Sequence, residues 1–388
     1  MKKYNFVTTK DGLKSTGTYN PNSFNALDAA IAFVIFIIAD LVLSVTFPLA
    51  VKAYRDTHAE FDYYLYLIVA TIAPQTFIFL IAFMFCKIRR VGYLNGGGYE
   101  FRFDGVNALF GIILTLGVAL VFYGVHLQFD DDILRIFYGM DYYEYSVIVS
   151  GRMNGNPLFA LLYIYVITPL IPAIVEEGFM RGVIMRGLGQ FGYVFAIIGS
   201  ALMFAIMHVN LQQFVLQFIF GIAVASVVML TKNFALGCVM HFANNLFVAL
   251  LDVTAANAGL ISEVGEYVVD AVRIIIGVAM LVISVIYFIN MLLAKNKRKI
   301  LGTGEKITIK DAGKYALIDS GTVDESGQAV YDKVVWKDIE IAGCELSGKQ
   351  YAYNGKIRKV NKKANVIASR ILLIIGVSFG AVAVILSV

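Results

Sequence analysis

Long apolar runs are the feature of this sequence that most limits its fold. Along the 388 residues there are about nine stretches of roughly 17 to 25 mainly apolar residues, the length that an α-helix needs to cross a bilayer. They lie near 27–50, 63–86, 105–127, 157–178, 191–208, 212–231, 234–252, 267–294 and 367–388. Because lipid cannot satisfy backbone polar groups, such runs must be helical. The expected fold class is an all-α polytopic membrane protein with about 8–9 transmembrane helices.

Composition supports a membrane protein over a soluble one. Hydrophobic residues make up 59% of the chain and charged residues 15%, whereas charged residues make up about a quarter of a soluble domain. The first 26 residues are polar and show no removable signal peptide. The three cysteines form no C-x-x-C pair, which argues against a disulfide framework and a thiolate zinc site. No nucleic-acid-binding motif is present, so nucleic acid is not an expected partner.

The distribution of charge predicts the orientation in the membrane. Lys and Arg gather near 2–14, 87–90, 181–186, 232 and 295–299, and acidic residues gather at 130–132 and 252–266. With nine spans these two groups fall on opposite sides, and basic loops face the cytoplasm. We therefore expect a multi-pass protein of the plasma membrane, with the N-terminal segment 1–26 cytoplasmic and Val388 outside. The basic segments are expected to attract anionic lipid.

Residues 295–366 differ in character from the helical core at 27–294. Short alternating pieces replace the long apolar runs, and Tyr353-Asn-Gly-Lys356 has the signature of a two-residue hairpin. We predict a small, basic, β-rich cytoplasmic domain at 295–366, inserted before a last transmembrane helix at 367–388. A tyrosine-rich loop at 128–156 is expected at the membrane interface, either as an aromatic belt or as a lid over a cavity.

Ionisable residues inside the predicted spans are the best pointers to function, because they are expensive at membrane depth. Glu176-Glu177-Gly-Phe-Met-Arg181 places a cation four residues after an acid, so that Glu177 and Arg181 can pair on a helix. Glu176 is rotated by about 100° from its neighbour and is expected to face a cavity. A purely structural ion pair would account for Glu177 and Arg181 but leaves the second acid without a cation.

Two histidines recur in neighbouring spans with polar and aromatic companions. Phe204 precedes His208 by four residues, and His241 precedes Asn245 by four, so each pair shares one face of its helix. A lone histidine in an apolar helix is usually a packing residue. Here the chain has only four histidines, and these two lie in spans close to the acidic pair.

Two histidines, a carboxylate and an amide support two chemistries, and the residues alone leave both open. Zn²⁺ could be bound by Glu176, His208 and His241, with water in the fourth position. Without metal, Glu176 with His208 could activate water as a general base, while His241 and Asn245 donate hydrogen bonds to an oxyanion. Both routes lead to hydrolysis of a carbonyl compound. The chain has no H-E-x-x-H motif, and the G-x-S-x-G match at 376–380 lies in an apolar span and is interpreted as chance.

The three motifs in order resemble those of the CAAX protease and bacteriocin-processing (CPBP, or Abi) family of intramembrane proteases. The matching residues are Glu176 to Arg181, Phe204 to His208, and His241 to Asn245, within about 157–252. The resemblance implies peptide-bond hydrolysis with Glu176, His208, His241 and Asn245 in the active site, and Glu177, Arg181 and Phe204 in support. It also implies a membrane-associated peptide or protein substrate, prenylated in some members, and leaves zinc and metal-free mechanisms open.

Two further functions stay open at this stage. A bacteriocin-immunity or scaffold protein could use the same fold without turnover. A transporter could use intramembrane Glu and His as a proton relay, although the halves of the chain show no internal symmetry by eye.

Overall fold

The structure is a computed structural model. It describes residues 6–9, 12–15, 24–57, 63–89, 92–94, 101–137, 162–208, 211–255, 263–296, 302–308, 316–327, 329–334, 350–353, 356–359 and 362–386.

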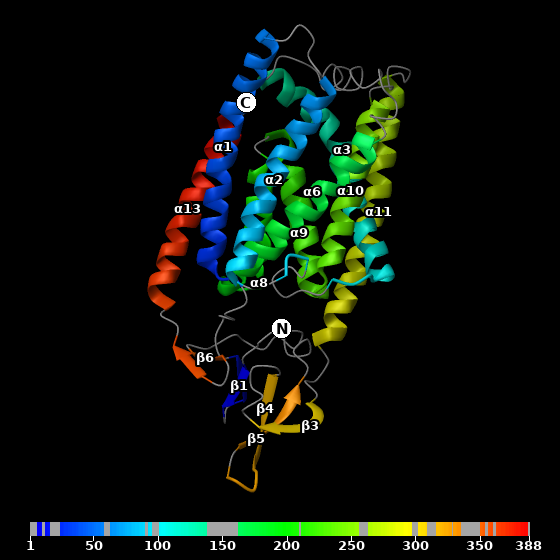
Figure 1. The fold of residues 1–388 in the computed structure, drawn as a ribbon. Helices are drawn as coiled ribbons and strands as arrows, with labels where there is room; N and C mark the ends of the chain where they lie inside the picture. The colour runs from blue at the N-terminus through cyan, green and yellow to red at the C-terminus, as the bar shows by residue number, and fades with distance from the viewer. Residues whose placement is uncertain are drawn as a thin grey trace.

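Long helices form the body of the molecule and run roughly alongside one another (Figure 1). They are α1 (Ala26–Thr57), α2 (Tyr63–Arg89), α3 (Gly105–Phe137), α8 (Tyr193–Met207), α9 (Leu211–Thr231), α10 (Phe234–Ala255), α11 (Glu263–Asn296) and α13 (Lys362–Leu386). Within the described residues, six helices are long and apolar enough to cross a membrane, and α8 and the apolar part of α10 are shorter. The predicted helical membrane protein is confirmed, whereas the number of crossings stays a prediction.

The acidic motif lies in a helical segment of changing pitch. A π-helical turn η1 (Tyr163–Ile167) leads into α6 (Thr168–Glu177), and a second π-helical stretch η2 (Gly178–Ile184) follows. The short helices α7 (Met185–Leu188) and η3 (Gly189–Phe191) complete the segment. Insertions of π-helix into α-helices are frequent at functional sites. Here a π-helical stretch begins immediately after the two glutamates.

Pro169 and Pro172 just before the glutamates favour a break in this span, since proline removes a helical hydrogen bond. That expectation is wrong, because both prolines lie inside α6. Pro169 stands in the first turn, where its missing N–H costs little, and the Thr168 hydroxyl donates to the Tyr163 carbonyl at 3.1 Å. The wider η1 turn thus accommodates the prolines without interrupting the helix.

Short strands lie at one end of the bundle (Figure 1). Within 295–366 an antiparallel sheet has the order β3 (Gly302–Thr308), β5 (Ala329–Val334), β4 (Ala316–Val323). Strands β6 (Gln350–Tyr353) and β7 (Lys356–Lys359) pair with Tyr353 opposite Lys356, which confirms the predicted hairpin. That these strands form a separate cytoplasmic domain stays a prediction.

Two features of the chain ends and loops were not predicted. An N-terminal hairpin of β1 (Phe6–Thr9) and β2 (Gly12–Ser15) contacts β4, so this hairpin packs on the inserted strands. Helix α3 continues to Phe137, which corrects the predicted start of a loop at 128. The tyrosines of that loop, Tyr138, Tyr142, Tyr143 and Tyr145, lie outside the described residues.

Two of the basic residues from which the membrane orientation was predicted are buried. Arg181 is completely shielded inside the helical core, and Lys232 lies at the turn between α9 and α10, 8% exposed, with its ammonium 5.3 Å from the Tyr193 ring centre. Neither is a free charge on a loop. The predicted orientation therefore depends on the remaining basic segments.

Packing around the acidic motif is tight at Gly178. A Cβ atom at this position would overlap the ring and hydroxyl of Tyr93, whose O–H donates to the Val175 carbonyl at 3.0 Å. Burial raises the pKa of the Tyr93 phenol, so it stays a donor. The glycine in the E-E-G-F-M-R motif is thus required by close approach of Tyr93.

Replacing Gly178 by Ala is expected to cost about 1–3 kcal/mol of stability, because a well-packed site has no room for the methyl group. Thermal unfolding in detergent measures the loss. Gly189→Ala is the matched control, since an added Cβ there meets no atom within 4 Å. Equal melting temperatures for the two variants would contradict the packing described at Gly178.

Candidate active site

The two adjacent glutamates end α6 and face different neighbours. Glu176 is 6% exposed and Glu177 is completely buried. Glu177 faces α10, where its Oε1 lies 3.0 Å from Nδ1 of His241, whereas Glu176 reaches α2, where its Oε1 lies 2.6 Å from Nε2 of Gln75. The rotation of about 100° per helical residue separates the two carboxylates in this way.

Glu177 pairs with Arg181 as predicted. Arg181 Nη1 lies 3.0 Å from Glu177 Oε1, and Arg181 Nη2 donates to the Gly221 carbonyl of α9 at 3.3 Å. The guanidinium also lies 4.9 Å from the centre of the Phe204 ring, a cation–π contact. A buried ion pair without further partners would be costly, so these contacts are what allow Arg181 to remain inside.

His241 is oriented by the same carboxylate. An ionised carboxylate only accepts hydrogen bonds, so Nδ1 of His241 carries a hydrogen and donates it to Glu177. The rings of Phe204 and Phe220 pack edge-on to the imidazole, with centre-to-centre distances of 5.5 and 5.3 Å. The other ring nitrogen, Nε2, lies 3.8 Å from Glu176 Oε2. Glu177 therefore links Arg181 to His241 and directs Nε2 of His241 toward Glu176.

Glu176 keeps one oxygen without a partner. Oε1 accepts a hydrogen bond from Gln75, but Oε2 is buried and has no hydrogen-bond partner among the described residues. A buried polar atom left unpaired is destabilising, which makes such atoms candidates for a functional role.

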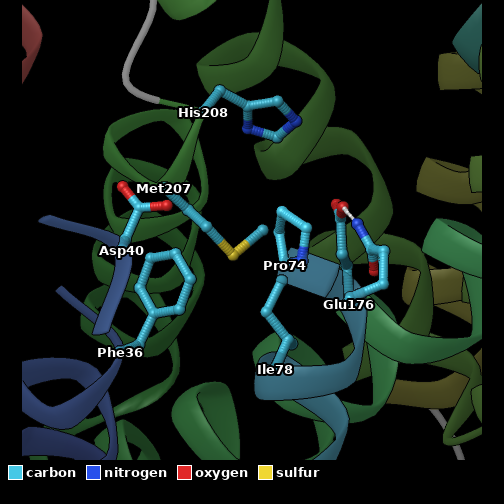
Figure 2. Close-up of a pocket in the computed structure, with 8 residues that line it drawn as sticks. Phe36, Asp40, Pro74, Ile78, Glu176, Met207 and His208 are labelled. Carbon is cyan, nitrogen blue, oxygen red and sulfur yellow. Dashed lines mark hydrogen bonds between the residues drawn. The ribbon is translucent and has the colours of Figure 1, made fainter. Parts of the chain in front are cut away.

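A small cavity lies beside the Glu176 side chain, between α1, α2, α6 and the end of α8 (Figure 2). Its volume is about 90 Å³, enough for several water molecules but well below the ~300–1,000 Å³ of a typical ligand pocket. The lining residues are Phe36, Asp40, Pro74, Gln75, Ile78, Glu176, Met207 and His208. The expectation that Glu176 faces a cavity is thus confirmed.

His208 follows the last residue of α8 and lines the same cavity. Its Nδ1 lies 2.8 Å from the Phe204 carbonyl of its own helix. A carbonyl accepts only, so Nδ1 is the donor and Nε2 is left for other partners. Phe204, predicted as a supporting residue, packs between His208 and His241, with ring centres at 4.7 and 5.5 Å.

Two of the predicted catalytic residues, His241 and Asn245, do not line the cavity, and His241 approaches it only through its 3.8 Å contact with Glu176. Asn245 has no such contact among the described residues. It is half-buried on α10 and absent from the cavity lining, so its role stays a prediction. Its neighbour Asn244 is 1% exposed, and its Oδ1 has no hydrogen-bond partner within the described residues. Asn244 and Asn245, three and four residues after His241, both lie on its face of the helix. The sequence pattern pointed only to Asn245.

A catalytic Zn²⁺ site needs three protein ligands gathered around one metal position. His208 and His241 each have Nδ1 bonded to an acceptor, as zinc-bound histidines usually do. However, no group of three or more His, Cys, Asp or Glu side chains in the described part of the chain is close enough to hold a metal ion. Glu176, His208 and His241 as they stand do not fit a three-ligand zinc site.

The fold and the site define a polytopic helical membrane protein with a buried acid–histidine cluster open to a cavity. Residues 157–247 match the family model for the type II CAAX prenyl endopeptidase Rce1-like family. This match covers the three motifs and confirms the predicted resemblance for that segment. Neither a curated protein nor a solved structure matches the chain significantly.

Removing the guanidinium of Arg181 should destabilise the protein by about 3–5 kcal/mol, because Glu177 would stay buried without its cation. Thermal unfolding of Arg181→Ala in detergent measures this. The double variant Arg181→Met with Glu177→Gln removes both charges and should lose less than the single variant. A melting temperature for Arg181→Ala equal to that of the wild type would disprove the pairing.

Proposed function

We propose that this protein is an intramembrane endopeptidase that hydrolyses a peptide bond of a membrane-associated peptide or protein. The observation that carries the proposal is the unpartnered Oε2 of Glu176, buried beside the cavity and 3.8 Å from Nε2 of His241. The match of 157–247 to an endopeptidase family supports the same reaction class.

In this mechanism Glu176 is the general base. A water molecule in the cavity donates one proton to Oε2 as its oxygen attacks the carbonyl carbon of the scissile peptide. The hydrogen bond from Gln75 holds Oε1 and leaves Oε2 for the water. Nε2 of His208, with Nδ1 bonded to Phe204, accepts the second water hydrogen and orients the water.

His241 acts on the tetrahedral intermediate. With Nδ1 donating to Glu177, its Nε2 accepts a proton in the neutral imidazole and donates a hydrogen bond only in the imidazolium. When Nε2 of His241 carries a proton, it donates to the oxyanion together with the amide of Asn245. The proton on Glu176 then passes to the leaving nitrogen, and the peptide C–N bond breaks to give a carboxylic acid and an amine.

The proposed substrates are of two kinds. They are either prenylated CAAX-type proteins or leader and bacteriocin peptides. The cavity has room for the reacting groups and the tip of a side chain but not for a peptide segment, because its volume is about 90 Å³. We therefore propose that the rest of the substrate lies along the helices outside the cavity. Binding of Zn²⁺ by Glu176, His208 and His241 is the alternative, and it requires these side chains to move closer together.

A non-catalytic immunity or scaffold protein on the same fold is the competing proposal, followed by a transporter. The network that orients His241 toward Glu176 favours an enzyme, since a scaffold needs neither a free carboxylate oxygen nor a directed imidazole. Both competing functions predict no cleavage of any peptide.

Replacing Glu176, His208 or His241 by Ala should lower peptide hydrolysis by about 100- to 10,000-fold, the usual contribution of a general acid or base. The measurement is cleavage of a mixed peptide library, including prenylated peptides, by detergent-purified protein. Membrane insertion should be unchanged for Glu176→Ala and His208→Ala, which leave Glu177 and Arg181 in place.

Glu325→Gln is the control, because Glu325 is exposed in a turn far along the chain. Full activity in any of the three alanine variants would remove that residue from the mechanism. Zinc content measured on the same samples separates the two chemistries: one zinc per active chain, lost with His208→Ala, would support the metal route, and activity without metal would support Glu176 as the base.

A further inference from the structure

The cavity has a second carboxylate that the proposed mechanism does not use. Asp40 of α1 lines the wall that faces Glu176, with Met207 beside it and His208 at the end of the cavity (Figure 2). It is half-buried within the apolar part of α1, from Ala26 to Tyr54, that is long enough to cross a membrane. An acidic residue in such a segment is a functional-site hypothesis by default.

Asp40 has no hydrogen-bond or ion-pair partner among the residues that the structure describes. By contrast Asp28, roughly three turns earlier on α1, forms a bidentate pair with Arg89 at 2.7 and 2.8 Å. Asp270 on α11 likewise pairs with Arg273 at 3.0 Å. Asp28, Glu177 and Asp270 are thus each paired with an arginine, and Asp40 is not.

The acidic side chains of the cavity lining favour a positively charged ligand. It contains the carboxylates of Asp40 and Glu176 and includes neither lysine nor arginine. Arg181 is not part of the lining, because that cation is fully buried and held by Glu177 and the Gly221 carbonyl. Independently of Asp40, the nine-tenths-buried Glu176 lines the same cavity, and its Oε2 has no hydrogen-bond partner among the described residues.

We propose that Asp40 is a specificity-determining residue that binds a basic side chain, Lys or Arg, of the substrate next to the scissile bond. This inference deepens the proposed peptidase function and rests on it. A substrate cation would supply the missing partner of Asp40 and would fix the peptide between α1 and α2. A metal ion is a poorer match, because the described residues gather no three ligands for one.

The test uses a peptide library in which each position around the cleaved bond carries Lys, Arg, norleucine or Glu, with products read by mass spectrometry. Wild-type protein should cleave Lys- and Arg-containing peptides about tenfold or more faster than norleucine ones at one position, as expected for a partly desolvated charge pair. Asp40→Asn, which keeps the shape, should lose this preference, and Asp40→Glu should retain it. Asp56→Asn, at an exposed position of the same helix, is the matched control.

The outcomes separate this inference from the peptidase proposal. Cleavage with no basic preference, or a preference that survives in Asp40→Asn, would overturn the role of Asp40 and leave the peptidase intact. Equal loss of all cleavage in Asp40→Asn, at unchanged melting temperature, would also overturn it and assign Asp40 to proton movement. If the wild type cleaves no peptide, both proposals fail.

Discussion

A carboxylate at membrane depth must be compensated, and the compensation of Glu177 organises the centre of this protein. Arg181 neutralises it from the next turn, and His241 donates to it from α10. Each partner is held in turn, Arg181 by the Gly221 carbonyl and Phe204, and His241 by Phe204 and Phe220. The network joins α6 and η2 to α8, α9 and α10, so the same contacts that bury the charge also assemble the site.

The two glutamates divide structure and chemistry between them. Oε1 of Glu177 has a cation and a histidine as partners, whereas Oε1 of Glu176 has one amide, Gln75; Oε2 is without a hydrogen-bond partner in both, and only Glu176 lines the cavity. Because the helix turns by about 100° per residue, neighbouring positions can serve these two roles without competing for the same partners. The Glu176 side chain lies where α1, α2 and α8 leave a small cavity, and the first two helices supply Asp40 and Gln75 to its wall.

Much of the centre could be predicted from the sequence, because its cause is local. The i, i+4 spacing of Glu177 and Arg181 gives their pair directly, and the unmatched acid gives a cavity-facing Glu176. Gln75 and Asp40 were missed because their importance depends on which helices pack together. A lone amide after Pro74 and a lone acid inside the first apolar run were the only signals in the sequence.

The prolines and the asparagines show where local rules fail. Pro169 and Pro172 suggest a break, but both lie inside α6, which directly follows the π-helical turn η1. The choice between Asn244 and Asn245 depends on the rotation of α10 against its neighbours, which spacing from His241 cannot resolve. The strands at 302–359 were predictable as short alternating pieces, whereas their sheet order β3-β5-β4 required the structure.

The most direct test of the account compares Glu176→Gln and Glu177→Gln, two isosteric changes at adjacent positions, for melting temperature and peptide hydrolysis on the same preparations. We predict that Glu176→Gln loses hydrolysis and keeps its melting temperature, because only the proton acceptor is removed. Glu177→Gln should lower the melting temperature, because Arg181 loses its counter-charge. The reverse pattern, or two variants alike in both measurements, would contradict the division of roles between the two glutamates.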